Sequence, residues 1–133
     1  MKTKFSFVLA AAIGAMLVSI PLLAHHSFAA QYDRQKPVTL AGVVTKLDWI
    51  NPHARFFINV KGANGQVPSW EVELGPPAGL MRRGWTRNSL KIGESITVEG
   101  FLAKDGSNLA NASTVTLSDG KKVFAGSSID STP

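Results

Sequence analysis

Apolar and polar residues alternate along two neighbouring segments of the chain, 54–61 and 67–74. Successive side chains of a strand point to opposite faces, so this alternation predicts two strands that each bury one face. Between the two segments, Asn64 and Gly65 are residue types that readily adopt the positive φ of a tight turn. The pattern therefore predicts a β-hairpin.

Three further segments have strand-like patterns, and one has a helical pattern. The additional strands are predicted at 38–49, 95–102 and 109–117, and residues 121–124 are expected to add a short edge strand. Gly42 interrupts the alternation of the first of these strands and indicates a bulge or a bend. Residues 78–83 are expected to form a short helix that ends at Gly84.

The order of these elements is three strands, a short helix and two strands, which is the order of the oligonucleotide/oligosaccharide-binding (OB) fold. The sequence thus predicts an all-β protein with one short helix, built as a small five-stranded OB-fold-like Greek-key barrel. A small β-sandwich is the competing architecture. The expected organisation is a signal peptide at 1–24, an N-terminal arm at 25–36, the OB-like β domain at 37–125 and a disordered tail at 126–133.

The first 24 residues have the layout of a secretory signal peptide. A positive start precedes a long apolar run that ends at Ala24, and a small residue at that position suits the cleaving enzyme. Cleavage there would start the mature chain at His25, whereas cleavage after Ala29 would start it at Ala30. An uncut segment would be close to the length that crosses a bilayer. We expect cleavage after Ala24, export to the periplasm and no stable membrane span.

Length and composition limit what the mature chain can do. The full chain has 133 residues, no cysteine and a formal net charge of +5, which falls by two when Lys2 and Lys4 leave with the signal. This length suits one domain with a modest core, and the lack of cysteine excludes disulfides and thiolate metal sites. Nucleic acid is not an expected partner, because salt weakens the small attraction that such a charge supplies.

His25, His26 and His53 are the only histidines of the chain. A chain that begins at His25 offers a free amine and an imidazole to one metal ion, and His26 or His53 would add a second imidazole. By analogy with the histidine brace of copper proteins, such nitrogen-rich tetragonal sites suit Cu(II) best. The pKa of the amine, about 8, allows its deprotonation at modest cost. Under the alternative interpretation, the first two histidines are exposed arm residues, and His53 only caps the preceding Asn-Pro turn.

A second set of residues suits an unknown small ligand or an envelope protein as partner: Trp49, Asn51, Arg82, Arg83, Trp85 and Arg87. Aromatic rings on the open face of an OB-like barrel stack on bases or sugars, and an arginine cluster attracts anions. Under the alternative interpretation, the tryptophans pack in the core and the arginines form an ordinary solvated face.

Glu71 and Glu73 lie two residues apart on one face of a predicted strand. Paired carboxylates supply acid and base in glycosidases, but here they are expected to form the solvated side of an alternating strand. The sequence contains no nucleophile motif, phosphate-binding loop or dinucleotide fingerprint. A hydrolase therefore ranks last among the candidate functions, and the chain is predicted not to be an enzyme.

A set of motifs carries a family resemblance: Ala24-His25-His26-Ser27-Phe28, 38–44, Trp49-Ile50-Asn51-Pro52-His53, 79–87, 98–100 and 122–126. These segments resemble a bacterial family of small exported proteins known only as a domain of unknown function, and they are distributed over nearly all of the mature chain. The resemblance implies export from a bacterial cell and a compact β domain. It brings no established activity.

The residues and the resemblance together predict an exported, non-enzymatic binding protein. In its most specific form, this hypothesis has the protein bind copper or another late transition metal through its N-terminal histidines. The alternative is a structural or interaction module of a cell-envelope complex that holds no metal.

Overall fold

The computed structural model describes residues 28–125. The predicted signal peptide, His25, His26 and the predicted tail at 126–133 lie outside the described residues. Within 28–125, no helix has the length and apolar character that crossing a membrane requires.

Six strands and two short helices make up the described chain. The strands are β1 (Tyr32–Asp48), β2 (Arg55–Asn59), β3 (Ser69–Glu73), β4 (Ser95–Ala103), β5 (Leu109–Thr116) and β6 (Lys122–Phe124). The helices are α2 (Phe28–Gln31) and α3 (Pro77–Arg82). Each strand from β2 to β6 overlaps a segment in which the apolar pattern predicts a strand, so the alternation located these elements correctly.

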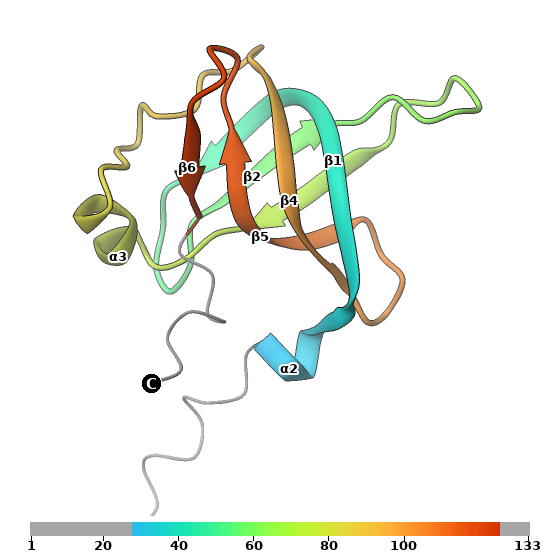
Figure 1. Ribbon diagram of the computed structural model, residues 1–133, viewed down its shortest axis with the longest axis horizontal. Coiled ribbons are helices and arrows are strands. Elements are labelled where there is room, and N and C mark those ends of the chain that lie inside the picture. The colour runs from blue at the N-terminus through green and yellow to red at the C-terminus, as the bar shows by residue number, and fades with distance from the viewer. Residues whose placement is uncertain (1–27, 126–133) are drawn as a thin grey trace, which may run out of the picture.

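The strands form one sheet in the order β3-β2-β1-β4-β5-β6, and β3 also pairs with β5. The β3–β5 pairing is parallel and short, whereas the other pairs are antiparallel. The β3–β5 pairing joins two strands that are not neighbours in the main strand order, so the sheet curls into an uneven, OB-like arrangement. β6 pairs with the free edge of β5. Figure 1 shows β1 curving around this assembly, with α3 on one side and the β2–β3 turn on the other. The predicted mostly-β, OB-like fold is confirmed.

Two glycines let neighbouring strands approach more closely than a side chain would allow. A Cβ on Gly42 of β1 would lie 2.6 Å from the carbonyl oxygen of Asn59, and one on Gly100 of β4 would lie 2.0 Å from that of Asn111. The pairing register shifts close to both positions, between Val44 and Lys46 in β1 and immediately before Gly100 in β4. A bulge near Gly42 was expected from the sequence, and it is found two to three residues further along.

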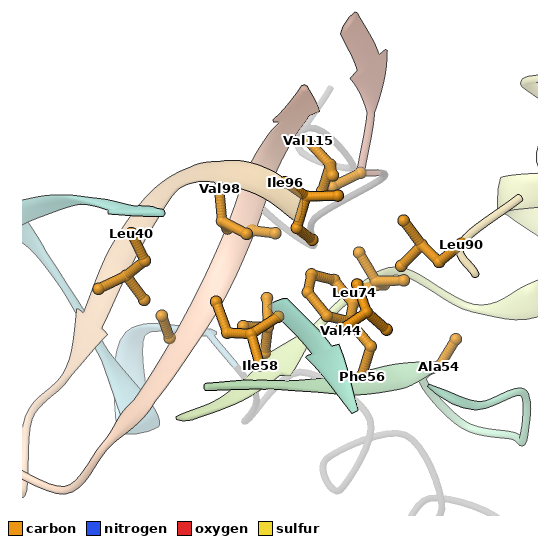
Figure 2. Packing of buried hydrophobic residues seen from close by; sticks show 14 of the residues in the cluster. Leu40, Val44, Ala54, Phe56, Ile58, Leu74, Leu90, Ile96, Val98 and Val115 are labelled. Carbon is orange, nitrogen blue, oxygen red and sulfur yellow. The ribbon is translucent and has the colours of Figure 1, made fainter. Parts of the chain in front are cut away.

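The main hydrophobic core lies between the strands. Figure 2 shows side chains of β1, β2, β4 and β5 pointing toward one another. Phe56, Ile58 and Val98 are fully buried, as expected for the inward face of alternating strands. α3 and the segment after it close the core with Leu80 and Trp85, which are also buried.

A second, smaller cluster forms where the sequence predicted an irregular arm. Phe28 in α2 and Tyr32 at the start of β1 are buried together with Ala103. Within the described residues, the predicted arm therefore contains the helix α2, and β1 begins at Tyr32 rather than near Val38. The alternation of apolar and polar residues does not reveal this start, because residues 33–37 are all polar or proline. In this part of the strand, the pairing of β1 with β4 is irregular between Tyr32 and Pro37.

Candidate functional site

Glu73, at the end of β3, is buried, with only 3% of its surface exposed. The expectation that Glu71 and Glu73 form a solvated strand face is therefore wrong for Glu73, while Glu71 is half-buried. At this end β3 has a partner on each side, because Glu73 pairs with Arg55 of β2 and with Asn111 of β5. The strand is thus internal here, and the face that carries Glu73 is covered by Tyr32.

Four side chains surround the Glu73 carboxylate. The Tyr32 hydroxyl donates to Oε2 at 3.1 Å, and Nδ2 of Asn111 donates to Oε1 at 3.3 Å. Nη2 of Arg55 lies 3.6 Å from Oε2, and Nδ1 of His53 lies 3.3 Å from Oε1. A buried carboxylate is stable only when hydrogen bonds and opposite charge compensate for its lost hydration. These five residues are called the Glu73 cluster below.

Arg55 and Asn111 fix the carboxylate from its two neighbouring strands. Besides facing Glu73, the Arg55 guanidinium pairs with the half-buried Glu71. Asn111 is fully buried, and its Oδ1 has no hydrogen-bond partner within residues 28–125. Its amide orientation therefore depends on the bond from Nδ2 to Glu73, because a flipped amide would place oxygen against oxygen.

His53 is the member of the Glu73 cluster that lies between the buried carboxylate and solvent. It follows Asn51 and Pro52 in the loop from β1 to β2, and its side chain is 21% exposed. Nδ1 faces the Glu73 carboxylate, which favours the tautomer that carries its proton on Nδ1. In the described chain, Nε2 takes part in no hydrogen bond, so the lone pair of this nitrogen is available to a ligand.

Tyr32 is held as a permanent hydrogen-bond donor. Burial raises the pKa of its phenol far above the usual range, and the negative charge of Glu73 and the hydrogen bond to it raise this pKa further. The phenol therefore stays protonated at physiological pH and donates to Glu73. It ties the start of β1 to the end of β3.

The chain before Tyr32 is fixed at the same end of the molecule. The ring of Phe28 lies 5.4 Å from that of Tyr32 and 5.9 Å from that of Phe101, measured between centroids. Lys104 donates its backbone N–H to the carbonyl of Gln31 at 2.9 Å, and its ammonium group donates to the carbonyl of Ala29. In Figure 1, α2 lies below the barrel, and the loop between β1 and β2 lies at its lower left, near α3.

Two residues of the predicted ligand-binding set lie at one groove. Trp49 is half-buried and packs against the main core, and Arg87 is exposed in the connector between α3 and β4. Both line the same surface depression. Trp85, by contrast, is 2% exposed and donates its indole N–H to the carbonyl of Phe124 at 2.8 Å. Its alternative interpretation as a core residue therefore fits its surroundings.

The remaining residues of that set are exposed and do not meet at one point in the contacts of the structure. Arg82 lies in α3, and the guanidinium of Arg83 lies 4.1 Å from the centroid of the Phe124 ring. Asn51 is exposed in the loop before His53. The cation–π contact of Arg83 is an ordinary surface interaction.

Of the three predicted metal ligands, only His53 belongs to the described residues. Among residues 28–125, no three histidine, cysteine or acidic side chains are grouped in a way that could hold a metal ion. His53 with Glu73 supplies only part of a donor set. The other two predicted ligands, His25 and His26, precede Phe28 in the sequence.

Sequence reasoning missed Tyr32, Arg55 and Asn111 as partners of Glu73. Tyr32 lies in the segment 25–36, for which the sequence predicted only an N-terminal arm. One signal was present, because Asn111 stands between two alanines in a predicted strand, and a polar residue at such a position requires a partner when it is buried.

Comparison with known proteins gives a family without an assigned activity. Residues 14–112 match the model of the Family of unknown function (DUF6152). No curated protein matches the chain. The match includes His25, His26 and His53 as well as Glu73, and it brings no ligand and no reaction.

Proposed function

The chain belongs to the DUF6152 family, and we propose that it is an exported, non-enzymatic protein that binds copper or another late transition metal. In this proposal His25 supplies the N-terminal amine and its imidazole, and Nε2 of His53 supplies a further nitrogen. His26 is the alternative source of the second imidazole. Export to the periplasm and cleavage after Ala24 belong to the same proposal.

The contact between His53 and Glu73 carries this proposal. Metal-binding histidines almost always direct their second ring nitrogen to a carboxylate, a carbonyl or water, which fixes the tautomer and raises the basicity of the metal-binding nitrogen. Here Nδ1 lies 3.3 Å from Oε1 of Glu73 and the ring is 21% exposed. A histidine that only capped the Asn-Pro turn would not need a buried carboxylate behind it.

The position of Phe28 gives further support. Phe28 contacts Tyr32, and the Tyr32 hydroxyl donates to the carboxylate that faces His53. His26 precedes Phe28 by two residues, and two extended residues span at most roughly 7 Å. Contacts between described residues thus link Phe28, through Tyr32 and Glu73, to His53.

The donor set favours copper. An amine and two imidazoles are borderline nitrogen ligands, and a tetragonal arrangement of such ligands suits Cu(II). The set lacks the thiolates of structural zinc sites, because the chain has no cysteine. Binding would release a proton from the amine, so the affinity is expected to rise with pH up to about 8.

The first experiment determines the intact mass of the exported protein and then titrates it with Cu(II). We expect a chain that begins at His25 and binds one Cu(II) ion with a d–d absorption band. A chain that begins at Ala30, or that keeps the signal peptide, would remove the amino-terminal ligand and contradict the proposal.

Three variants test the ligands by competition titration. His53→Ala should lower the affinity for Cu(II) by more than Glu73→Gln, for which a loss of roughly 10- to 100-fold is expected because Glu73 acts through His53. Asn64→His in the His53→Ala background is the control, since it restores the histidine count on the exposed β2–β3 turn. Equal affinity of the native protein and His53→Ala, or restoration by Asn64→His, would count against the site.

A further inference from the structure

A groove lies where the end of β1 meets the connector between α3 and β4. It has a volume of about 480 Å³, and it is lined by Leu47, Trp49, Arg87, Asn88, Leu90 and Ile92. His53 and Glu73 are not among these residues, so the groove is separate from the Glu73 cluster. This volume is within the range of small-molecule sites.

Four of the six residues that line the groove are apolar, and the other two are Arg87 and Asn88. Leu47 and Trp49 pack against the main core, and Leu90 belongs to that core. Ile92 is 66% exposed, so an apolar side chain stands at the rim with most of its surface in water. A flat apolar molecule placed between Trp49 and Ile92 would remove this surface from water and stack on the indole.

Within residues 28–125, the two polar side chains that line the groove, those of Arg87 and Asn88, make no hydrogen bond or ion pair. Within residues 28–125, no carboxylate lies within ion-pair distance of Arg87. Asn88 uses its backbone N–H on Thr86, and its side-chain amide makes no hydrogen bond in the described chain. A guanidinium without a partner beside an apolar wall matches a planar carboxylate, which it can bind through two parallel hydrogen bonds.

The acidic side chains near the groove are already engaged. Asp48 pairs with Lys46 at 2.9 Å. The two oxygens of Glu94 accept hydrogen bonds from the backbone N–H of Lys91 and from Ser118. The groove therefore combines apolar side chains with the positive charge of Arg87, which pairs with no carboxylate of residues 28–125.

From this combination we propose that the groove binds a small aryl carboxylate. The ring packs between Trp49 and Ile92, and the carboxylate binds the guanidinium of Arg87 and the amide of Asn88. This site does not depend on the metal proposal, because the two share no residue.

The test uses 2-naphthoate and its uncharged analogue 2-naphthamide as probes of the exported, processed protein. Titration is followed by the indole N–H signals of the three tryptophans in heteronuclear NMR spectra. We expect saturable binding of naphthoate with a dissociation constant below about 1 mM, a shift confined mainly to Trp49, and at least about tenfold weaker binding of the amide.

Arg87→Gln should weaken naphthoate binding by roughly 10- to 100-fold, as expected for the loss of a hydrogen bond between charged groups. Arg82→Gln removes the same charge from α3, outside the groove, and should change the affinity by less than about twofold. His53→Ala should bind naphthoate as the native protein does, so failure of the metal proposal and of this one are distinguishable. The proposal is overturned by absent saturation, by equal binding of the amide, or by equal losses in Arg82→Gln and Arg87→Gln.

Discussion

The main core and the Glu73 cluster are both buried, but they arise from the sequence in different ways. The core consists of apolar side chains that recur at every second position of strands such as β2, where Phe56 and Ile58 are fully buried. In the cluster, Glu73 depends on Tyr32, 41 residues earlier, and on Asn111, 38 residues later. The core is thus specified by local periodicity, whereas the cluster is specified by contacts between distant strands.

The two regions also differ in what a substitution does to them. Removing an apolar side chain leaves a cavity, and the cost increases with its volume. Removing one member of a buried polar cluster leaves its former partners without hydrogen bonds or with uncompensated charge. The following predictions compare the two regions, beginning with the largest expected loss of stability.

Phe56→Ala should lower the free energy of unfolding by about 3 to 5 kcal/mol, because removing this fully buried ring leaves a cavity in the main core. Denaturant unfolding followed by tryptophan fluorescence measures the change. Phe57→Ala on the same strand is the matched control, since Phe57 is only half-buried and faces the other side. A loss for Phe57→Ala as large as that for Phe56→Ala would show that the main core is not where the structure places it.

Glu73→Gln should cost about 3 kcal/mol of unfolding free energy. Both oxygens of Glu73 accept hydrogen bonds, whereas an amide offers one oxygen and places an NH₂ group against a donor. The charge of Arg55 would also lose its counterpart at Glu73. Chemical denaturation of the metal-free protein measures this loss, and a change below about 0.5 kcal/mol would mean that the carboxylate is hydrated rather than buried.

Tyr32→Phe should cost about 1.5 kcal/mol at neutral pH, since it removes one hydrogen bond to a charged group. The native protein should also lose stability as the pH rises above about 10, where the phenol ionises only in the unfolded chain. In this pH range the folded protein keeps the phenol proton that the unfolded chain loses, because the pKa of Tyr32 is raised in the folded state. Rising pH therefore favours the unfolded state. The Phe variant should lack this part of the alkaline decline.

A spectroscopic titration gives a direct check of the same residue. Tyr32 is the only tyrosine of the chain, so the ultraviolet absorbance of tyrosinate reports on it alone. We expect no tyrosinate signal near pH 10 in the folded protein and its sudden appearance with alkaline unfolding. A smooth titration at about pH 10 without unfolding would contradict the burial of the phenol.

Glu71→Gln should have the smallest effect, below about 1 kcal/mol. Glu71 is half-buried, and its ion pair with Arg55 is partly screened by water. Because it is the same chemical change two residues from Glu73 on the same strand, it is the control for Glu73→Gln. Similar losses of unfolding free energy for the two variants would show that the burial of Glu73 does not make its carboxylate more important for stability than that of Glu71.

The apolar patterns and turn residues were sufficient to predict the strands apart from the start of β1, the β2–β3 hairpin, α3 and the OB-like order of elements. Alternation was misleading for Glu73, because it identifies which residues share a face but not what covers that face. Here the cover is Tyr32, from a segment whose polar residues gave no strand signal. The burial of Glu73 follows from the parallel β3–β5 pairing and from the close approach of β5 to Gly100, neither of which local sequence encodes.

His53 shows the same difference between what residue type predicts and what only the three-dimensional contacts reveal. Residue type alone suggested that His53 is a metal ligand, whereas its orientation toward Glu73 required the three-dimensional structure. The sequence likewise did not distinguish the roles of the two tryptophans. In the structure, Trp49 lines a groove, whereas Trp85 is a core residue whose indole N–H donates a hydrogen bond.

Pulsed electron paramagnetic resonance of the Cu(II)-loaded, exported protein measures the proposed coordination most directly. The remote nitrogen of each coordinated imidazole gives a characteristic coupling, so the spectrum reports how many histidines bind the metal. We predict that the spectrum of the native protein contains the coupling of His53 and that His53→Ala loses one imidazole while the fold is retained. Identical spectra for the two proteins would contradict a metal site that joins the N-terminal chain to His53.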